Sequence, residues 1–185
     1  MGLIESAATL ARPILNIPAV RRTRRNHGLE HATIHILAQR KSPLKMAGRS
    51  DSRGFFLYGN VSTEEVESAV AEALRRMRSG QHDLALHPNC GTNLLTTGTL
   101  ATLAAMIGFA GTDENPESRL ERFPTILLLV IGTLIFAPPL GMAFQRHFTT
   151  LGDPGDLEVE RIEQRTIQSP LGGELTVHRV DTIRG

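Results

Sequence analysis

The sequence predicts an α+β protein that consists of a small cytoplasmic α/β unit, a transmembrane hairpin of two helices and a C-terminal β-hairpin. Two runs, 84–112 and 123–145, contain no Asp, Glu, Lys or Arg, and each is long enough to include a membrane span. Helix and strand patterns precede the first run, and two partly alternating segments follow the second. We therefore expect a cytoplasmic domain over 1–91, the transmembrane hairpin over 92–145 and a C-terminal tail over 146–185.

The composition excludes several classes of protein. The 185 residues carry a formal net charge of only +1, which argues against a polybasic protein, so we expect no nucleic-acid partner. There is no Trp and only one Tyr, too few aromatic side chains for a base-stacking surface. A single Cys cannot form an internal disulfide, which excludes a disulfide-stapled secreted scaffold.

The first helix expected from the pattern spans Asn26–Arg40. Asn26 or Thr23 is the expected N-cap, because either side chain can accept a hydrogen bond from the first helical turn. The following segment, 41–53, contains Pro, Gly and several Ser residues, so we expect it to be a loop.

A strand and a second helix follow. The segment Gly54–Val61 is rich in apolar residues and ends at a Gly-Asn turn signal, which is typical of a strand. Ser62 followed by Glu65 forms a capping box, and the apolar period predicts a helix from there to Arg78. Leu84–Leu86 is expected to be a short strand or an extended segment.

The two uncharged runs differ in their strength as membrane spans. The apolar part of the first, Leu94–Gly111, contains four Thr residues, whose hydroxyl groups can bond to their own helix. The second is more apolar, and Pro138–Pro139 are expected to kink or end it. The connector 113–122 is charged and is expected to be a polar turn between antiparallel spans. A pair of buried helices in a soluble core is the alternative.

The arginines beside the runs favour a cytoplasmic location for both termini. The positive-inside rule counts charges close to the spans. Four arginines flank the hairpin on its terminal sides and two lie in the connector: Arg75, Arg76, Arg78 and Arg146 against Arg119 and Arg122. In the tail, Leu157–Ile167 and Glu174–Ile183 predict a β-hairpin, whose edges could pair with a partner.

The sharpest chemical feature is the sequence His-Gly-Leu-Glu-His at 27–31. Helical residues four apart lie about 40° apart around the axis, so His27 and His31 can bind one metal ion from a single face. Glu30 lies on the same broad face, where a carboxylate can accept a proton from water on the ion. His27 is expected in the first helical turn, where the helix dipole favours the neutral, ligating imidazole.

A catalytic zinc site needs a third protein ligand and an open position. His87 and Cys90, directly before the first span, are the candidates, and Zn²⁺ or another divalent transition metal is the expected cofactor. His35 lies ~12 Å along the helix axis from His27, so it cannot share one ion with both other helical histidines. It either supports the ligands without binding the ion or is the partner of His31 in an alternative site. Solvated surface histidines are the alternative to any metal site.

Three segments carry a resemblance to known proteins: HGLEHATIHIL, GRSDSRGFFLYGNVSTEEVESAV and HPNCGTNLL, followed by the membrane hairpin. They look like an uncharacterised bacterial membrane family (a domain of unknown function), and they are more distantly similar to the YqhQ-like family of predicted metal-dependent membrane proteins. The resemblance covers roughly residues 24–145. It implies a bacterial inner (cell) membrane location and no established substrate. It also implies candidate roles for the residues His27, Glu30, His31, His87 and Cys90.

Two functions fit these features. One is a zinc-dependent, membrane-associated hydrolase with its site at the cytoplasmic membrane surface and Glu30 as general base. The alternative is a non-enzymatic accessory or assembly subunit of a larger membrane complex, in which any metal is structural. The lipid bilayer is a partner in both, and a membrane protein or a second copy of the chain could be another. Four protein ligands would close the site and three would leave it open; the sequence offers enough for either.

Overall fold

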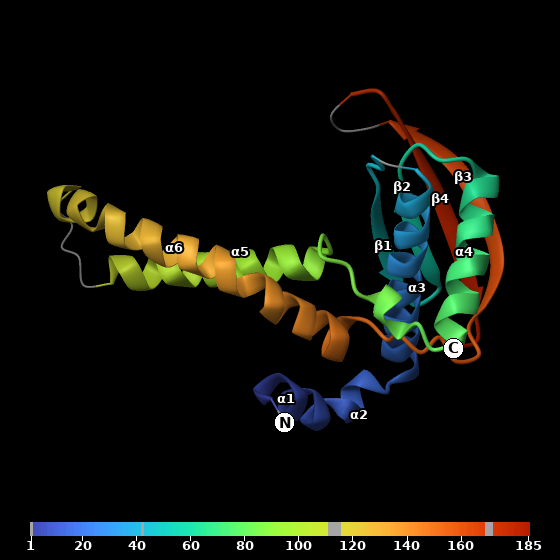
Figure 1. The fold of residues 1–185 in the computed structure, drawn as a ribbon, viewed down its shortest axis with the longest axis horizontal. Coiled ribbons are helices and arrows are strands. Elements are labelled where there is room, and N and C mark those ends of the chain that lie inside the picture. The colour runs from blue at the N-terminus through green and yellow to red at the C-terminus, as the bar shows by residue number, and fades with distance from the viewer. Residues whose placement is uncertain (1, 42, 111–115, 169–171) are drawn as a thin grey trace. The chain divides into compact units, whose positions relative to one another are not determined.

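The fold is described from a computed structural model (Figure 1). The described residues are 2–41, 43–110, 116–168 and 172–185, with backbone only for 116–119. The expected polar connector therefore lies partly outside the described residues, as does part of the turn in the C-terminal hairpin.

The chain forms two compact units. We call Met1–His87 with Arg146–Gly185 the α/β unit, and Pro88–Gln145 the helical-hairpin unit. The C-terminal tail thus shares one unit with the N-terminal part of the chain, and the helical hairpin leaves and re-enters this unit between its two segments.

The α/β unit contains four α-helices, a 3₁₀ helix and four strands among its described residues. In chain order these are α1 (Leu3–Leu10), α2 (Arg12–Leu15), α3 (Pro18–Arg40), β1 (Ala47–Asp51), β2 (Gly54–Tyr58), α4 (Thr63–Arg78), η1 (His82–Ala85), β3 (Glu158–Gln168) and β4 (Glu174–Ile183). The helical-hairpin unit contains α5 (Gly91–Phe109) and α6 (Pro116–Phe144), and a π-helical turn, η2 (Gln145–Thr149), follows α6.

The four strands form one antiparallel sheet in the order β1-β2-β4-β3. The expected strand Gly54–Val61 is present as β2, and the expected C-terminal hairpin is present as β3 and β4. The β2–β4 pairing, with Phe56 opposite Arg179, joins segments from the two ends of the chain. The C-terminal hairpin is therefore half of the sheet and not an appendage.

The core lies between the sheet and the two long helices, α3 and α4. α3 packs against α4, β1 and β2, whereas α4 also contacts β3 (Figure 1). The buried face of α4 is the one that its sequence period predicts, and the Ser62–Glu65 capping box is present. Leu29, Phe55 and Val180 contribute fully buried side chains from three different elements. Each such side chain stabilises the fold by about 1.5–3 kcal/mol relative to an exposed one.

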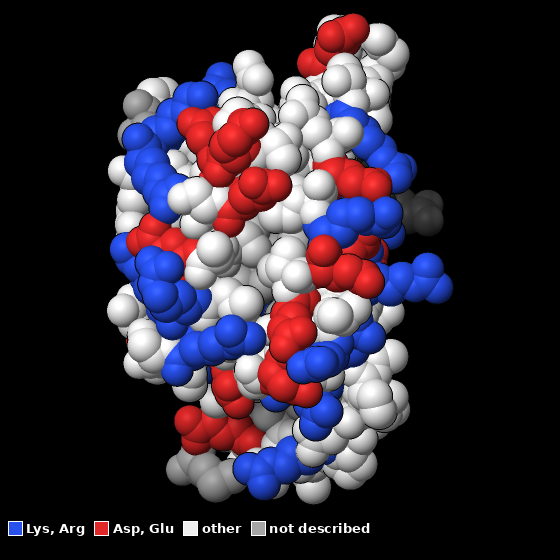
Figure 2. All heavy atoms as spheres, turned by 90° about the vertical axis from the view of Figure 1, so that its right-hand side faces the viewer, with Lys and Arg blue, Asp and Glu red and all other residues white. Residues whose placement is uncertain are grey.

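The outer surface of this unit on the α4 and β3 side carries charges of both signs. Figure 2 shows Lys and Arg interspersed with Asp and Glu over this face. Glu72 of α4, for example, pairs with Arg40 and Arg76, and Arg161 of β3 pairs with Asp181. Such a mixed surface is typical of a face in contact with water.

Three local expectations are wrong, and one of the two effects expected of Pro138–Pro139, the end of the helix, is excluded. α3 begins at Pro18, so neither Thr23 nor Asn26 is its N-cap. The physical reason is that proline favours the first helical position, and nothing in the arginine-rich segment that follows interrupts the helix. The supposed loop before β2 contains β1, and Leu84–Leu86 overlaps the 3₁₀ helix η1 and is not a strand. Pro138–Pro139 do not end α6, which continues to Phe144.

The two helices of the helical-hairpin unit are long and apolar enough to cross a membrane, by length and composition. The candidate segments are Gly91–Phe109 and Leu120–Thr149, with mean hydropathy 1.2 and 2.2. Only 11% and 17% of their most apolar windows are buried, which disfavours the alternative of core helices in a soluble domain. The helices pack closely, because a Cβ on Gly108 would lie 2.5 Å from the Ile126 side chain.

His178 makes the stability of the α/β unit dependent on pH. Its ring is fully buried in β4, where Nε2 lies 3.3 Å from the Thr63 hydroxyl and Nδ1 has no partner among the described residues. Burial lowers the pKa of His178 below 6.5, because the charged ring would lose its hydration. The unfolded chain thus binds the proton more readily, and this contribution to stability is present above about pH 6.5 and lost as the pH falls below it.

We therefore predict that unfolding in denaturant, followed by fluorescence of the single Tyr58 on β2, has a lower midpoint at about pH 5.5 than at about pH 7.5. His178→Gln should reduce this difference, whereas His82→Gln, which removes an exposed ring, should preserve it. An equal pH dependence in wild type and His178→Gln would contradict the assignment.

Candidate metal centre

One face of α3 presents three histidines at four-residue spacing: His27, His31 and His35. The rings of His27 and His31 meet edge to face, with their centroids 4.4 Å apart. His31 is 2% exposed and His27 is half-buried, so the pair does not belong to a fully solvated surface. The predicted juxtaposition of two imidazoles one helical turn apart is thus present.

His87 returns to the same face at the end of the segment that follows η1. Its ring centroid lies 4.8 Å from that of His35 and 5.6 Å from that of His31. Four imidazoles from two segments of the α/β unit therefore form one group, which we call the histidine cluster (His27, His31, His35 and His87). The role of His35 is open from the sequence, and in the structure its ring contacts that of His87.

Backbone carbonyl groups orient the three helical rings. Nδ1 of His31 lies 2.7 Å from the carbonyl oxygen of Ala85, and Nδ1 of His27 lies 3.0 Å from that of Thr149. Nε2 of His35 lies 2.7 Å from the carbonyl oxygen of Leu86. Because a carbonyl oxygen only accepts, each of these nitrogens carries the proton in the neutral ring. The lone pair is then on Nε2 of His27 and His31, and such carbonyl partners are usual for metal-binding histidines.

The electrostatic environment keeps His87 neutral. Burial, and then the neighbouring His35 and His31, lower the pKa of His87 from 6.5 to about 4. The neutral ring is the form that can bind a metal ion. The expectation that His27 lies in the first helical turn, where the helix dipole would favour its neutral ring, is wrong. α3 begins at Pro18, so His27 lies more than two turns inside the helix.

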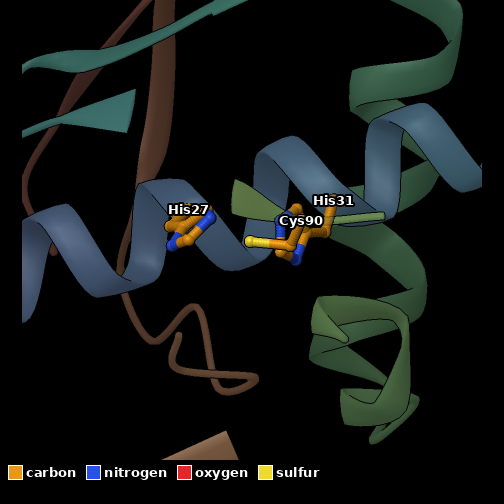
Figure 3. A group of neighbouring side chains, drawn as sticks. All are labelled: His27, His31 and Cys90. Atoms are coloured by element: carbon orange, nitrogen blue, oxygen red, sulfur yellow. The ribbon is translucent and has the colours of Figure 1, made fainter. Parts of the chain in front are cut away.

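Cys90 follows His87 by three residues, so their Cα atoms are at most about 11 Å apart. It is the N-cap residue of α5, and its Sγ accepts a hydrogen bond from the Thr92 amide at 3.4 Å. One candidate ligand atom each of His27, His31 and Cys90 lies within 4.8 Å of the others, a group that could hold a metal ion (Figure 3). Three of the four predicted ligands thus form that group, and His87 contacts it through His31.

The side chain of Glu30 lies between α3 and β1. Its side chain is buried, and its carboxylate accepts a hydrogen bond from the Ser50 hydroxyl. Gly48 makes room for it, because a Cβ at that position would lie 2.1 Å from Oε1 of Glu30. Burial raises the pKa of Glu30, whereas the Ser50 hydrogen bond and the nearby His27 oppose the increase. The predicted catalytic role of Glu30 stays a prediction, since its carboxylate contributes no atom to the three-residue ligand group.

The close approach of another backbone segment explains why the second residue of the His-Gly-Leu-Glu-His motif, Gly28, has no side chain. A Cβ there would lie 2.6 Å from the carbonyl oxygen of Leu151, and the Leu151 amide donates to the carbonyl oxygen of Arg24 at 3.0 Å. The absence of a side chain therefore lets the returning backbone lie directly on α3. The same approach brings the Thr149 carbonyl to His27.

Arg24 is a residue of the site's surroundings that the sequence analysis does not single out. It is 9% exposed and donates from Nη2 to the carbonyl oxygens of His147 and Thr150, at 3.0 and 3.1 Å. It thereby fixes the segment that positions His27. In the sequence, Arg24 is marked only by its place in a run of arginines directly before the motif.

Comparison with known proteins places the chain among proteins of unknown function. The family model described as "Domain of unknown function (DUF6391)" matches residues 22–162. An uncharacterised protein of the cyanobacterium Picosynechococcus sp. is 34% identical over 160 residues, which cover 79% of this chain and 74% of that protein. No solved structure matches the chain. The expectation of an uncharacterised family is confirmed.

We predict that the full chain, purified from zinc-supplemented cells, contains about one equivalent of metal. His31→Ala should abolish it, because His31 supplies the buried imidazole at the centre of the cluster. His82→Ala removes an exposed histidine outside the cluster and should leave the content unchanged. Elemental analysis by mass spectrometry gives the ratio; a wild type without metal, or equal content in wild type and His31→Ala, would contradict the prediction.

Proposed function

The chain belongs to the DUF6391 family, whose function is unknown, and we propose that it is a membrane-anchored, metal-dependent hydrolase. His27 and His31 hold the ion, and the turn from His87 to Cys90 supplies the third ligand. The observation that carries this proposal is the pair of imidazoles 4.4 Å apart, each with its Nδ1 on a backbone carbonyl. With Nδ1 protonated, Nε2 is the ligating nitrogen of each ring, as is usual in histidine metal sites.

The donor types favour zinc as the ion. Imidazole suits several divalent transition metals, and a thiolate beside it favours Zn²⁺ over the oxygen-preferring Mg²⁺ and Ca²⁺. Two histidines with one further ligand leave a fourth position for water or substrate, which is the pattern of catalytic zinc sites. When bound, the ion supplies a Lewis acid that activates water and polarises a carbonyl or phosphoryl oxygen.

Glu30 is the general base in this proposal. The nearby His27 acts to lower the pKa of Glu30, which supports a position of this carboxylate close to the histidine pair. Burial raises the pKa of Glu30, and a higher pKa makes a carboxylate a better acceptor of a proton from water. The Ser50 hydroxyl holds the carboxylate in one orientation. An acid–base role of this kind contributes about 10²–10⁴-fold to a rate.

The reaction takes place at a membrane surface if α5 and α6 span the bilayer. Cys90 caps α5, so the ligand turn continues directly into the first candidate span. The arginines that flank the spans support a cytoplasmic location of both termini. The resemblance to an uncharacterised bacterial membrane family supports a bacterial inner membrane. A site at this level suits a peptide or lipid-linked substrate that approaches along the bilayer.

A second function is favoured by one observation, the contact of the His87 ring with those of His31 and His35. With both His87 and Cys90 as ligands, four protein groups would close the site, and a closed site is structural. The chain would then be an accessory or assembly subunit of a membrane complex. β1 and β3, the outer strands of the sheet, offer edges for a partner protein or a second copy of the chain.

The Glu30→Gln variant distinguishes these functions. We predict that the zinc-loaded variant, reconstituted in lipid, keeps its metal but hydrolyses ester and peptide test substrates about 10²–10⁴-fold more slowly than wild type. Glu67→Gln changes an exposed carboxylate on α4 and should leave the rate unchanged. Loss of metal in Glu30→Gln would make Glu30 a ligand. A wild type that binds zinc and hydrolyses none of the substrates would favour the structural site.

The proposed topology is tested by reporter fusions to the full chain in a bacterial host. Fusions at the N-terminus and at the C-terminus should both be active in the cytoplasm, because two spans return the chain to its starting side and arginines flank them on that side. Cell fractionation should place both fusions in the membrane. A periplasmic location of either terminus, or recovery of the fusions in the soluble fraction, would overturn the topology.

A further inference from the structure

The α/β unit contains a cleft of about 600 Å³ between its N-terminal helices and the segment that follows α6. α1, α2, the first half of α3 and η2 contribute to its walls. The cleft is lined by three arginines, Arg12, Arg24 and Arg146, and by His147, against a single carboxylate, Glu5. It is therefore a basic cleft, and none of its lining residues belongs to the histidine cluster.

The positive charge of the cleft is poorly neutralised by the protein. Arg24 is nine-tenths buried, donates only to backbone carbonyls and has no ion pair with any described residue; its buried Nε has no partner. Arg12 likewise forms no ion pair within the described ranges. Arg146 pairs with Asp83, but both side chains are more than half exposed. Glu5 is used as the cap of α1, where it accepts from the Gly2 amide at 3.0 Å.

A buried guanidinium without a counter-ion indicates that an anion completes the cleft. Burial of a charge is costly unless the charge is paired, and the carbonyl partners of Arg24 supply only partial charges. Arginine binds phosphate oxygens with two parallel hydrogen bonds, which makes phosphate the anion that a cluster of arginines suits best. The volume of the cleft exceeds that of one phosphate group, so it leaves room for a ligand with further atoms.

Exposed apolar side chains on the adjacent helices indicate that the rest of the ligand is apolar. Leu3 and Leu10 of α1 are 92% and 83% exposed, and Ile14 of α2 is 64% exposed. Helices with exposed apolar residues next to arginines are typical of segments that lie in the interface of a membrane. Two lining residues of the cleft also follow the second candidate span closely in the sequence, because Arg146 and His147 come only two and three residues after the end of α6.

We propose that the basic cleft binds the phosphate group of an anionic phospholipid, while Leu3, Leu10 and Ile14 enter the acyl-chain region beside it. The proposal rests on the membrane topology proposed above and does not depend on the metal or on hydrolysis. In it, Arg24 is the fixed, buried contact of the phosphate, and Arg12 and Arg146 close over it from the surface. The site anchors the N-terminal helices to the leaflet from which α6 emerges.

The test uses the full chain in detergent and native mass spectrometry with added phosphatidylglycerol or phosphatidylcholine. Wild type should retain phosphatidylglycerol in preference to phosphatidylcholine. Arg12→Gln should weaken retention of phosphatidylglycerol about tenfold, the effect expected from one lost charge-assisted hydrogen bond. Arg165→Gln, on exposed β3 and outside the cleft, should retain the lipid as wild type does. Arg12 is exposed, so its replacement leaves the fold intact, unlike that of Arg24.

Two further arms identify the source of the phosphate. Excess inorganic phosphate should not displace the lipid, and Leu10→Ser with Ile14→Ser should weaken its retention while the protein still inserts into membranes. Displacement by phosphate, or retention unaffected by the apolar substitutions, would overturn the lipid as ligand. Equal retention of both lipids, or equal retention by wild type and Arg12→Gln, would overturn the site. Metal content and reporter topology, measured on the same variants, show separately whether the proposed function fails.

Discussion

The structure depends on the close packing of two returning backbone segments against the histidine-bearing face of α3. One segment is η1 with the residues up to His87, and the other runs from Arg146 to Leu151. Each offers carbonyl oxygens to imidazole N–H groups, from Ala85 and Leu86 on one side and from Thr149 on the other. Each bond gives a partner both to a backbone carbonyl group and to an imidazole N–H group. A buried polar group without a partner would destabilise the fold by about 1–3 kcal/mol.

This packing joins the fold to the candidate chemistry. The two segments are the ones that lead into and out of the helical hairpin, so the bonds that orient the imidazoles also fix the two ends of the chain from which the candidate spans depart. Gly28 and Arg24 permit the contact on the side of Leu151, the first by its small size and the second by its hydrogen bonds. A metal ion bound to this face would therefore stabilise the junction as well as supply reactivity.

Much of the fold follows from local sequence signals. α4 carries its own capping box and apolar period, and the C-terminal hairpin and the long uncharged runs are similarly self-contained. β1 carries no such signal: Ala-Gly-Arg-Ser-Asp has no apolar run and is a strand because it pairs with β2, where Ala47 lies opposite Tyr58. The pattern predicts the start of α3 only at Asn26, because the segment before it is rich in arginine, although Pro18 is a favourable first helical residue.

The same distinction applies to the site. The spacing of His27 and His31 predicts their proximity, since both lie on one helix. The surroundings of Glu30 could not be predicted, because Ser50 and Gly48 lie on the strand that the sequence did not reveal. The carbonyl partners of the imidazoles also carry no signal, because any residue supplies a carbonyl oxygen and only the tertiary path of the chain decides which one arrives.

The most direct test of the metal centre is X-ray absorption spectroscopy of the zinc-loaded full chain. The expected first shell contains imidazole nitrogens at about 2.0–2.1 Å, with a sulfur at about 2.3 Å if Cys90 is a ligand. The imidazole contribution should decrease when His27 and His31 are both replaced by Ala. A shell made only of oxygen, or a spectrum that this double substitution leaves unchanged, would contradict a metal centre on α3.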